Sequence, residues 1–191
     1  ELPVRTQFFD LKSKAETQNL SVTEILEKNS FVKEKSVSEP AKWLDQFKSV
    51  THGSLTHKLM QALKYSKNVD ALINRWFQIE REEVYRALDF MKGLSEPPLI
   101  ELIENGHVEM GFSYRESEQI IDGQIDLWGV ADGKVWIIDY KTGSVRYREK
   151  AFLQLEYYAK ALRKSGMIDS DQKIQLSVIY PFSENVFNKT F

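Results

Sequence analysis

Two aspartates and a lysine lie close together in a segment that predicts a β-hairpin. Asp126 and Asp139 flank the dipeptide Asp-Gly at 132–133, and Lys141 follows two residues after the second aspartate. An Asp-Gly pair between β-rich runs is a strong signal for a two-residue hairpin loop. Such a loop places Asp126 directly opposite Asp139, and a four-residue loop over 131–134 keeps that register, whereas a three-residue loop breaks it. Lys141 then points to the same face of the sheet as Asp139.

Opposed carboxylates in a sheet repel each other, so this pair favours a site for a cation. Directly facing residues have Cβ atoms roughly 4.5–5.5 Å apart, where like charges destabilise the pairing. Mg²⁺ takes oxygen ligands, commonly one or two carboxylates with water and substrate phosphate, and it can polarise a phosphoryl oxygen and activate water. The ammonium of Lys141 can stabilise negative charge on the phosphoryl group. The alternative is a surface salt-bridge cluster, but Asp139 ends the apolar run 135–138, which favours the cation site.

The composition is that of a globular protein of one domain, or of one domain with an arm. The chain has 191 residues, of which 42% are hydrophobic and 28% charged, within the usual range for soluble domains. We find no transmembrane run and no signal peptide, so no membrane partner is expected. The sequence contains no cysteine, which excludes disulfides, thiolate zinc sites and iron–sulfur clusters and fits a reducing cytoplasm. Because it starts at Glu1 rather than Met, we expect a piece of a longer protein.

The charge distribution limits how the chain can hold nucleic acid. The net charge of −2 argues against nonspecific binding by bulk electrostatics. One local basic patch follows the predicted hairpin and comprises Lys141, Arg146, Arg148 and Lys150. By itself this patch is typical of a solvated charged loop, but its position beside the two acids makes it a candidate for DNA binding.

The periodicity predicts an α/β protein with a mixed sheet, in which an antiparallel meander is flanked by helices. Residues 1–50 are expected to form an N-terminal arm with short helices, one of them starting at the capping box Ser21–Glu24, and residues 51–191 a core. The expected helices of the core are 54–65, 69–91, one short helix near 100–103, and 151–164. Its expected strands are 108–115, 120–130, 135–141 and a final strand, 174–180.

Four motifs in this order resemble the nuclease domain of RecB-type and AddA-type helicase–nucleases in the PD-(D/E)XK superfamily. The first is Gly-x-x-x-His at 53–57, the second Gly-Gln-Ile-Asp at 123–126, the third Asp-Tyr-Lys-Thr at 139–142, and the fourth Gln-x-x-x-Tyr at 154–158. The segment Leu-Ser-Val-Thr-Glu at 20–24 is also similar to the start of AddA-type nuclease domains. Together these motifs cover most of the chain, so the resemblance implies the restriction-endonuclease-like fold for the core.

The resemblance implies a role for each residue that matches a motif. His57, Asp126 and Asp139 correspond to metal ligands, with the carbonyl of Tyr140 as a main-chain ligand. Lys141 corresponds to the catalytic lysine, and Glu109 to a glutamate that acts as a ligand or binds water. Gln154 and Tyr158 correspond to positions that support the site or touch DNA, although packing within a helix is the ordinary role of such residues.

The resemblance also implies a reaction and its partners. We expect a Mg²⁺-dependent deoxyribonuclease, with Mn²⁺ as a substitute, which acts on DNA as an exonuclease in bacterial double-strand-break repair in the cytoplasm. A helicase region of the same full-length chain and a second subunit of the AddB or RecC type are the expected partners. The sequence has neither the phosphate-binding loop of a motor nor the cysteines of an iron–sulfur cluster. Two alternatives stay open: an inactive nuclease-like module for DNA binding or subunit docking, and a stand-alone nuclease of the RecB family.

Overall fold

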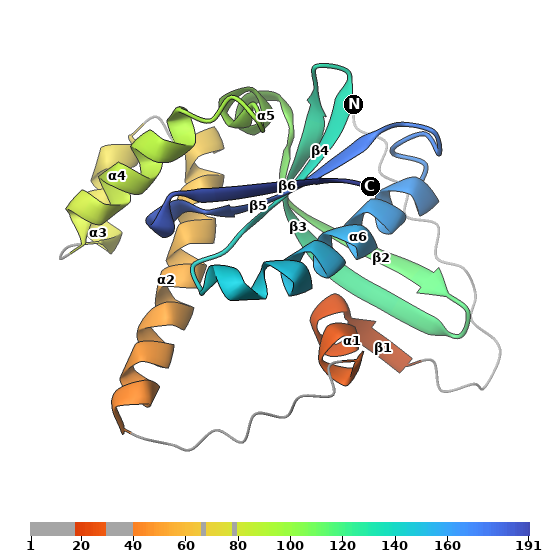
Figure 1. The fold of residues 1–191 in the computed structure, drawn as a ribbon, viewed down its shortest axis with the longest axis horizontal. Coiled ribbons are helices and arrows are strands. Elements are labelled where there is room, and N and C mark those ends of the chain that lie inside the picture. Colours follow the sequence, from red (N-terminus) through yellow and green to blue (C-terminus); the bar gives the residue numbers. More distant parts are fainter. Residues whose placement is uncertain (1–17, 30–39, 66–67, 78–79) are drawn as a thin grey trace, which may run out of the picture.

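The fold is one mixed sheet with helices on both faces (Figure 1). The computed structural model describes residues 18–29, 40–65, 68–77 and 80–191. The strands are β1 (Gln18–Ser21), β2 (His107–Glu116), β3 (Gln119–Ala131), β4 (Lys134–Tyr140), β5 (Ile174–Tyr180) and β6 (Asn185–Thr190). The helices are α1 (Val22–Asn29), α2 (Pro40–Tyr65), α3 (Val69–Trp76), α4 (Arg81–Lys92), α5 (Leu99–Asn105) and α6 (Arg148–Lys164), with two 3₁₀ turns, η1 (Val145–Tyr147) and η2 (Pro181–Ser183). This architecture confirms the expected α/β fold.

The hairpin between β3 and β4 has the predicted register. Asp132 and Gly133 both have positive φ, 52° and 70°, as a type I′ turn requires. Pairing runs without a shift from Ala131↔Lys134 to Leu127↔Ile138, one position before the two acids. There the Asp126 Oδ2 accepts a hydrogen bond from the backbone N–H of Tyr140 at 2.8 Å. A side chain of β3 thus replaces the ladder at the carboxyl end of β4.

The long strand β3 has an opening along one of its edges. One edge pairs with β2 from Gln119 to Trp128. The other edge pairs with β1 over 119–122 and with β4 over 127–131. Among the described residues, the stretch 123–126 of this edge therefore has no strand beside it. The side chains that could do chemistry gather around this opening.

Two hydrophobic clusters hold the sheet between its helices. On one face, Val135 and Ile137 of β4 pack with Leu155 of α6 and with Val22 of α1. On the other face, Trp136 and Ile138 pack with residues from α2 to α5. The apolar run 135–138 is continuous because both faces of β4 are covered, which is typical of central strands with helices on both sides.

The single helix predicted over 69–91 is wrong, because the structure contains two helices there. α3 ends at Trp76, and Phe77 closes it with a backbone hydrogen bond to Ile73. α4 starts only at Arg81. Phe77 is 2% exposed and belongs to the same cluster as residues of α4. Tertiary packing therefore decides this break, since the segment contains neither Gly nor Pro.

The sheet is also larger than the sequence predicts. β5 has the predicted bounds but is not the final strand, because β6 pairs with it antiparallel from Gln175↔Thr190 to Tyr180↔Asn185. β6 is short and mostly polar, which is common for edge strands and weakens the sequence signal. β1 was not predicted either, and α2 begins at Pro40 rather than at Ser54.

The N-terminal segment packs on the rest of the fold. β1 runs parallel to β3, and Val22 and Leu26 of α1 are buried in the cluster that includes α6. The predicted capping box is confirmed: the N–H of Ser21 donates to the Glu24 carboxylate, and the N–H of Glu24 donates to the Ser21 hydroxyl. The division into an arm and a core at residue 50 stays a prediction. Among the described helices, none combines the length and the apolar character needed to cross a bilayer.

Candidate active site

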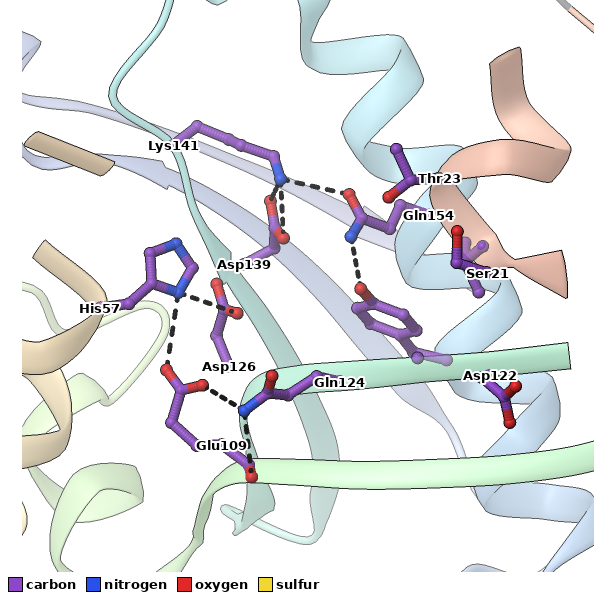
Figure 2. Close-up of a pocket in the computed structure, with 13 residues that line it drawn as sticks. Ser21, Thr23, His57, Glu109, Asp122, Gln124, Asp126, Asp139, Lys141 and Gln154 are labelled. Atoms are coloured by element: carbon purple, nitrogen blue, oxygen red, sulfur yellow. Dashed lines mark hydrogen bonds and ion pairs between the residues drawn. The ribbon is translucent and has the colours of Figure 1, made fainter. Parts of the chain in front are cut away.

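Three side chains from three elements converge beside the opening in β3 (Figure 2). The Nδ1 atom of His57, on α2, lies 3.2 Å from Asp126 Oδ1 and 3.5 Å from Glu109 Oε1. One potential ligand atom from each of the three residues lies within 4.8 Å of the other two. Asp126 is 8% exposed, and the side chains of Glu109 and His57 are 18% and 34% exposed. The cluster is thus partly closed and still accessible from solvent.

This cluster has the electrostatics of a cation site. Hydrogen bonds to Asp126 and then to Glu109 raise the pKa of His57 to about 10, although burial opposes the shift. Two carboxylates that face one position repel each other unless a positive charge lies between them. A proton on His57 supplies such a charge, and a divalent cation would supply more of it. Carboxylate oxygens are the ligands that Mg²⁺ and Mn²⁺ prefer, and His57 adds one imidazole nitrogen, so these residues can hold the expected metal.

Glu109 reaches the cluster through an unusual backbone conformation. Its φ is 52°, in the left-handed region that few non-glycine residues adopt. The pairs Val108↔Leu127 and Met110↔Ile125 on either side keep the same register, so Glu109 is turned within β2 without an inserted residue. Gln124 of β3 holds it there, because its Nε2 donates to Glu109 Oε2 at 2.6 Å. Strained residues of this kind are common at functional sites.

A second chain of polar contacts lines the other side of the opening. Asp139 is 1% exposed, and Lys141 Nζ lies 3.0 and 2.9 Å from its two carboxylate oxygens. The same Nζ donates to Gln154 Oε1 at 3.1 Å. Gln154 Nε2 in turn donates to the hydroxyl of Tyr158, one turn further along α6. The lysine head is therefore fixed by a strand and a helix at once.

Burial and charge shift the pKa values of Asp139 and Lys141 in ways that keep the lysine positively charged. Burial raises the pKa of Asp139 above its ordinary range, while Lys141 opposes that shift. Burial would lower the pKa of Lys141, but the charge and the hydrogen bond of Asp139 outweigh it, so the pKa is raised. Lys141 is consequently an ammonium group at neutral pH and can donate hydrogen bonds.

One cavity of about 500 Å³ joins the two groups of side chains. Seven predicted site residues line it: His57, Glu109, Asp126, Asp139, Lys141, Gln154 and Tyr158. The predicted ligand Tyr140 takes part through its backbone N–H to Asp126, while its ring is buried in the core. The guanidinium carbon of Arg146 lies 4.6 Å from the centroid of the Tyr147 ring, and that of Arg148 lies 5.0 Å from the centroid of the Phe187 ring. Neither arginine lines this cavity. Their predicted contact with DNA stays a prediction.

Six lining residues were not among the predicted site residues: Ser21, Val22, Thr23, Asp122, Gly123 and Gln124. Gln124 belongs to the Gly-Gln-Ile-Asp motif, but its contact with Glu109 depends on the left-handed backbone, for which the sequence carries no signal. Ser21 and Thr23 line the cavity from the start of α1, as Figure 2 shows. The capping box over 21–24 predicts the start of a helix, but not that this helix lies beside the cavity.

One comparison with known proteins agrees with this geometry. A family model of the PD-(D/E)XK nuclease superfamily matches residues 34–189. A comparison with curated proteins gave no match. The matched region contains the cluster of His57, Glu109 and Asp126, the Asp139–Lys141 pair and α6.

Proposed function

Because the chain belongs to the PD-(D/E)XK nuclease superfamily, we propose that its site is that of a Mg²⁺-dependent deoxyribonuclease that hydrolyses phosphodiester bonds. The observation that carries the proposal is the cavity itself. It brings the His57–Glu109–Asp126 cluster and the Asp139–Lys141 pair to the same opening of the sheet. A buried acid beside a fixed ammonium, next to a set of metal-ligating atoms, suits the binding of a phosphate whose charge increases during hydrolysis.

The residues that would hold the metal come from three strands and one helix. His57, Asp126 and Glu109 offer the converging atoms, and Asp139 with the carbonyl of Tyr140 are the further ligands that the motif implies. A bound Mg²⁺ or Mn²⁺ supplies a Lewis acid that polarises a phosphoryl oxygen and lowers the pKa of water. Asp126 is oriented for this role by the N–H of Tyr140, and Glu109 by Gln124.

Side chains of the protein would bind and orient the phosphate and the attacking water. Lys141 presents an ammonium to the scissile phosphate and donates hydrogen bonds to the negative oxygens that form during in-line attack, or to the attacking water. Gln154 holds the ammonium in place from α6, which reduces the entropy lost when the substrate binds. The buried carboxylate of Asp139 keeps Lys141 charged.

The finer assignment is a nuclease domain of an AddA-like or RecB-like helicase–nuclease that acts as an exonuclease in double-strand-break repair. The four motifs at 53–57, 123–126, 139–142 and 154–158 support it. On this proposal a helicase region and a second subunit bring DNA to the site, which would compensate for the net charge of −2.

The test is cleavage of linear single- and double-stranded DNA with Mg²⁺. We expect Asp139→Ala and Lys141→Ala each to lower the rate by about 10²-fold or more, as for loss of one electrostatic group. Asp169→Ala and Lys134→Ala remove the same charges outside the cavity and should leave the rate unchanged. Equal rates in all five proteins would overturn the mechanism. Calorimetry that finds no binding of Mg²⁺ would favour the inactive DNA-binding or docking module instead.

A further inference from the structure

A second cavity opens directly beside the catalytic one. Its volume is about 310 Å³. It shares three lining residues with the catalytic cavity, Thr23, Lys141 and Gln154. Its other lining residues are Gly143, Ser144, Tyr147, Lys150, Ala151 and Tyr180. Whatever lies against Lys141 in the catalytic cavity therefore has this second cavity as its immediate neighbour.

Two aromatic residues, Tyr147 and Tyr180, line the second cavity. Tyr180 is 2% exposed and is held edge-on against Phe187, with 6.1 Å between ring centroids. Tyr147 is 51% exposed, and the guanidinium of Arg146 lies 4.6 Å from its ring centroid. Arg146 also donates a hydrogen bond to the Tyr147 hydroxyl. The exposed ring is thus supported by its neighbour while it still lines the cavity.

We propose that this cavity binds the base of the nucleotide next to the scissile phosphate. The inference rests on the proposed function, since it takes the phosphate at Lys141 as its starting point. Nucleobases stack on aromatic side chains through their flat faces, and an aromatic cavity of this size accepts a flat heterocycle of that kind. A base is joined to its phosphate through one sugar, so a phosphate at Lys141 carries its base to the adjoining cavity.

The charges around the cavity fit a nucleotide better than an isolated phosphate. Lys150 contributes an ammonium to the lining, which can contact a neighbouring phosphate of the same strand. Beside this lysine, the rings of Tyr147 and Tyr180 and the methyl group of Ala151 offer the uncharged surface that a base requires. A base must also leave its stack to enter, and that costs least in single strands.

The experiment combines a protein change with a substrate change. Single-stranded oligonucleotides carry one abasic nucleotide at successive positions around the cleavage point, and affinity is measured by fluorescence anisotropy with Ca²⁺ in place of Mg²⁺. We expect one abasic position beside the scissile phosphate to weaken binding about tenfold, the range found for loss of one stacked base. Tyr147→Ala should weaken binding of intact DNA by a similar factor and abolish the penalty at that one position.

Tyr65→Ala is the matched control, because Tyr65 is 68% exposed and lies outside both cavities. It should bind every oligonucleotide as the unaltered protein does. If the unaltered protein cleaves DNA, but Tyr147→Ala keeps the abasic penalty and the affinity of the control, the base-binding cavity is disproved while the nuclease proposal stands. If the unaltered protein neither cleaves nor binds any oligonucleotide, the proposed function itself fails.

Discussion

At the residue scale, the site is a balance between carboxylates that repel one another and the few cations that compensate them. His57 lies against Asp126 and Glu109, and Lys141 lies against Asp139. His57 can give up its proton when a metal ion takes its place, whereas Lys141 stays an ammonium group because Asp139 raises its pKa. The two halves of the cavity should therefore respond differently to pH.

The affinity for Mg²⁺ should rise with pH through the window set by His57. Its pKa is raised from 6.5 to about 10 by Asp126 and Glu109, so a cation must displace a proton throughout this window. Release of one proton per cation increases the apparent affinity up to about tenfold per pH unit. Calorimetric titration with Mg²⁺ at several pH values measures the slope. His57→Gln should bind more weakly at high pH and show a smaller slope, and an unchanged slope would contradict the assignment.

The free energy of unfolding of the protein without added metal should fall as the pH rises, whereas the affinity for Mg²⁺ rises. A group whose pKa is higher in the folded state stabilises it fully below the unfolded value, and that contribution is lost as pH rises through the folded value. For His57 the loss falls between about 6.5 and 10. Denaturant unfolding with a chelator present should show the free energy of unfolding falling across this window. In His57→Gln the fall should be smaller, and an equal fall in both proteins would assign it to other groups.

Gln124 should tune the metal affinity although it offers no ligand atom to the cluster. It donates to Glu109 at 2.6 Å and so opposes the relaxation of a left-handed backbone. Loss of a group that orients a ligand typically lowers metal affinity about 10–100-fold. We expect Gln124→Leu to show this loss in calorimetry with Mn²⁺, and Gln124→Glu not to restore it, because a carboxylate cannot donate. Gln119→Leu, on the same strand but away from the cavity, should bind Mn²⁺ like the unaltered protein.

At the element scale, local signals predicted the elements that carry the motifs, and tertiary packing determined the others. Asp132-Gly133 predicts the turn because both residues need positive φ, and the register of β3 and β4 follows from it. Phe77 illustrates the opposite case, since it ends α3 by burial and no local breaker marks the position. The left-handed backbone of Glu109 has no sequence signal, although the family resemblance places this residue near the site, because the conformation depends on contacts with α2 and β3. The sequence does not predict β6 for a third reason, because an edge strand needs few apolar residues.

The capping box at the start of α1 gives the prediction at this scale. Ser21 and Glu24 exchange hydrogen bonds that satisfy backbone N–H groups of the first turn, and Ser21→Ala should cost about 1 kcal/mol. Because α1 is short and borders the cavity, we expect the loss to appear as local opening. Hydrogen exchange should be faster in α1 and unchanged in β5 and α6. Thr23→Ala, at an exposed position of the same turn, serves as the control, and equal exchange in both variants would contradict the capping role.

At the scale of the whole molecule, three adjoining cavities form one path across the sheet opening. The cavity lined by Tyr147 shares Lys141 and Gln154 with the catalytic one. On the other side, a cavity of about 370 Å³ beside α2 shares His57, Glu109 and Gln124 with it. Lys58 lines this cavity and Lys150 lines the one at the opposite end. The path thus has one lysine at each end, and Lys141 lies with the acids in the middle.

This distribution predicts weak and salt-dependent binding of single-stranded DNA by the domain alone. Each phosphate neutralised on a single strand adds about −0.7 to the slope of log K against log salt. Contacts at Lys58, Lys141 and Lys150 would give a slope near −2 by that rule. Lys58→Ala and Lys150→Ala should each make the slope shallower by about 0.7, whereas Lys92→Ala, on α4 and outside the path, should not change it. Anisotropy titrations at several salt concentrations measure these slopes. If Lys92→Ala changes the slope as much as Lys58→Ala does, DNA follows another surface, and the path through the three cavities is wrong.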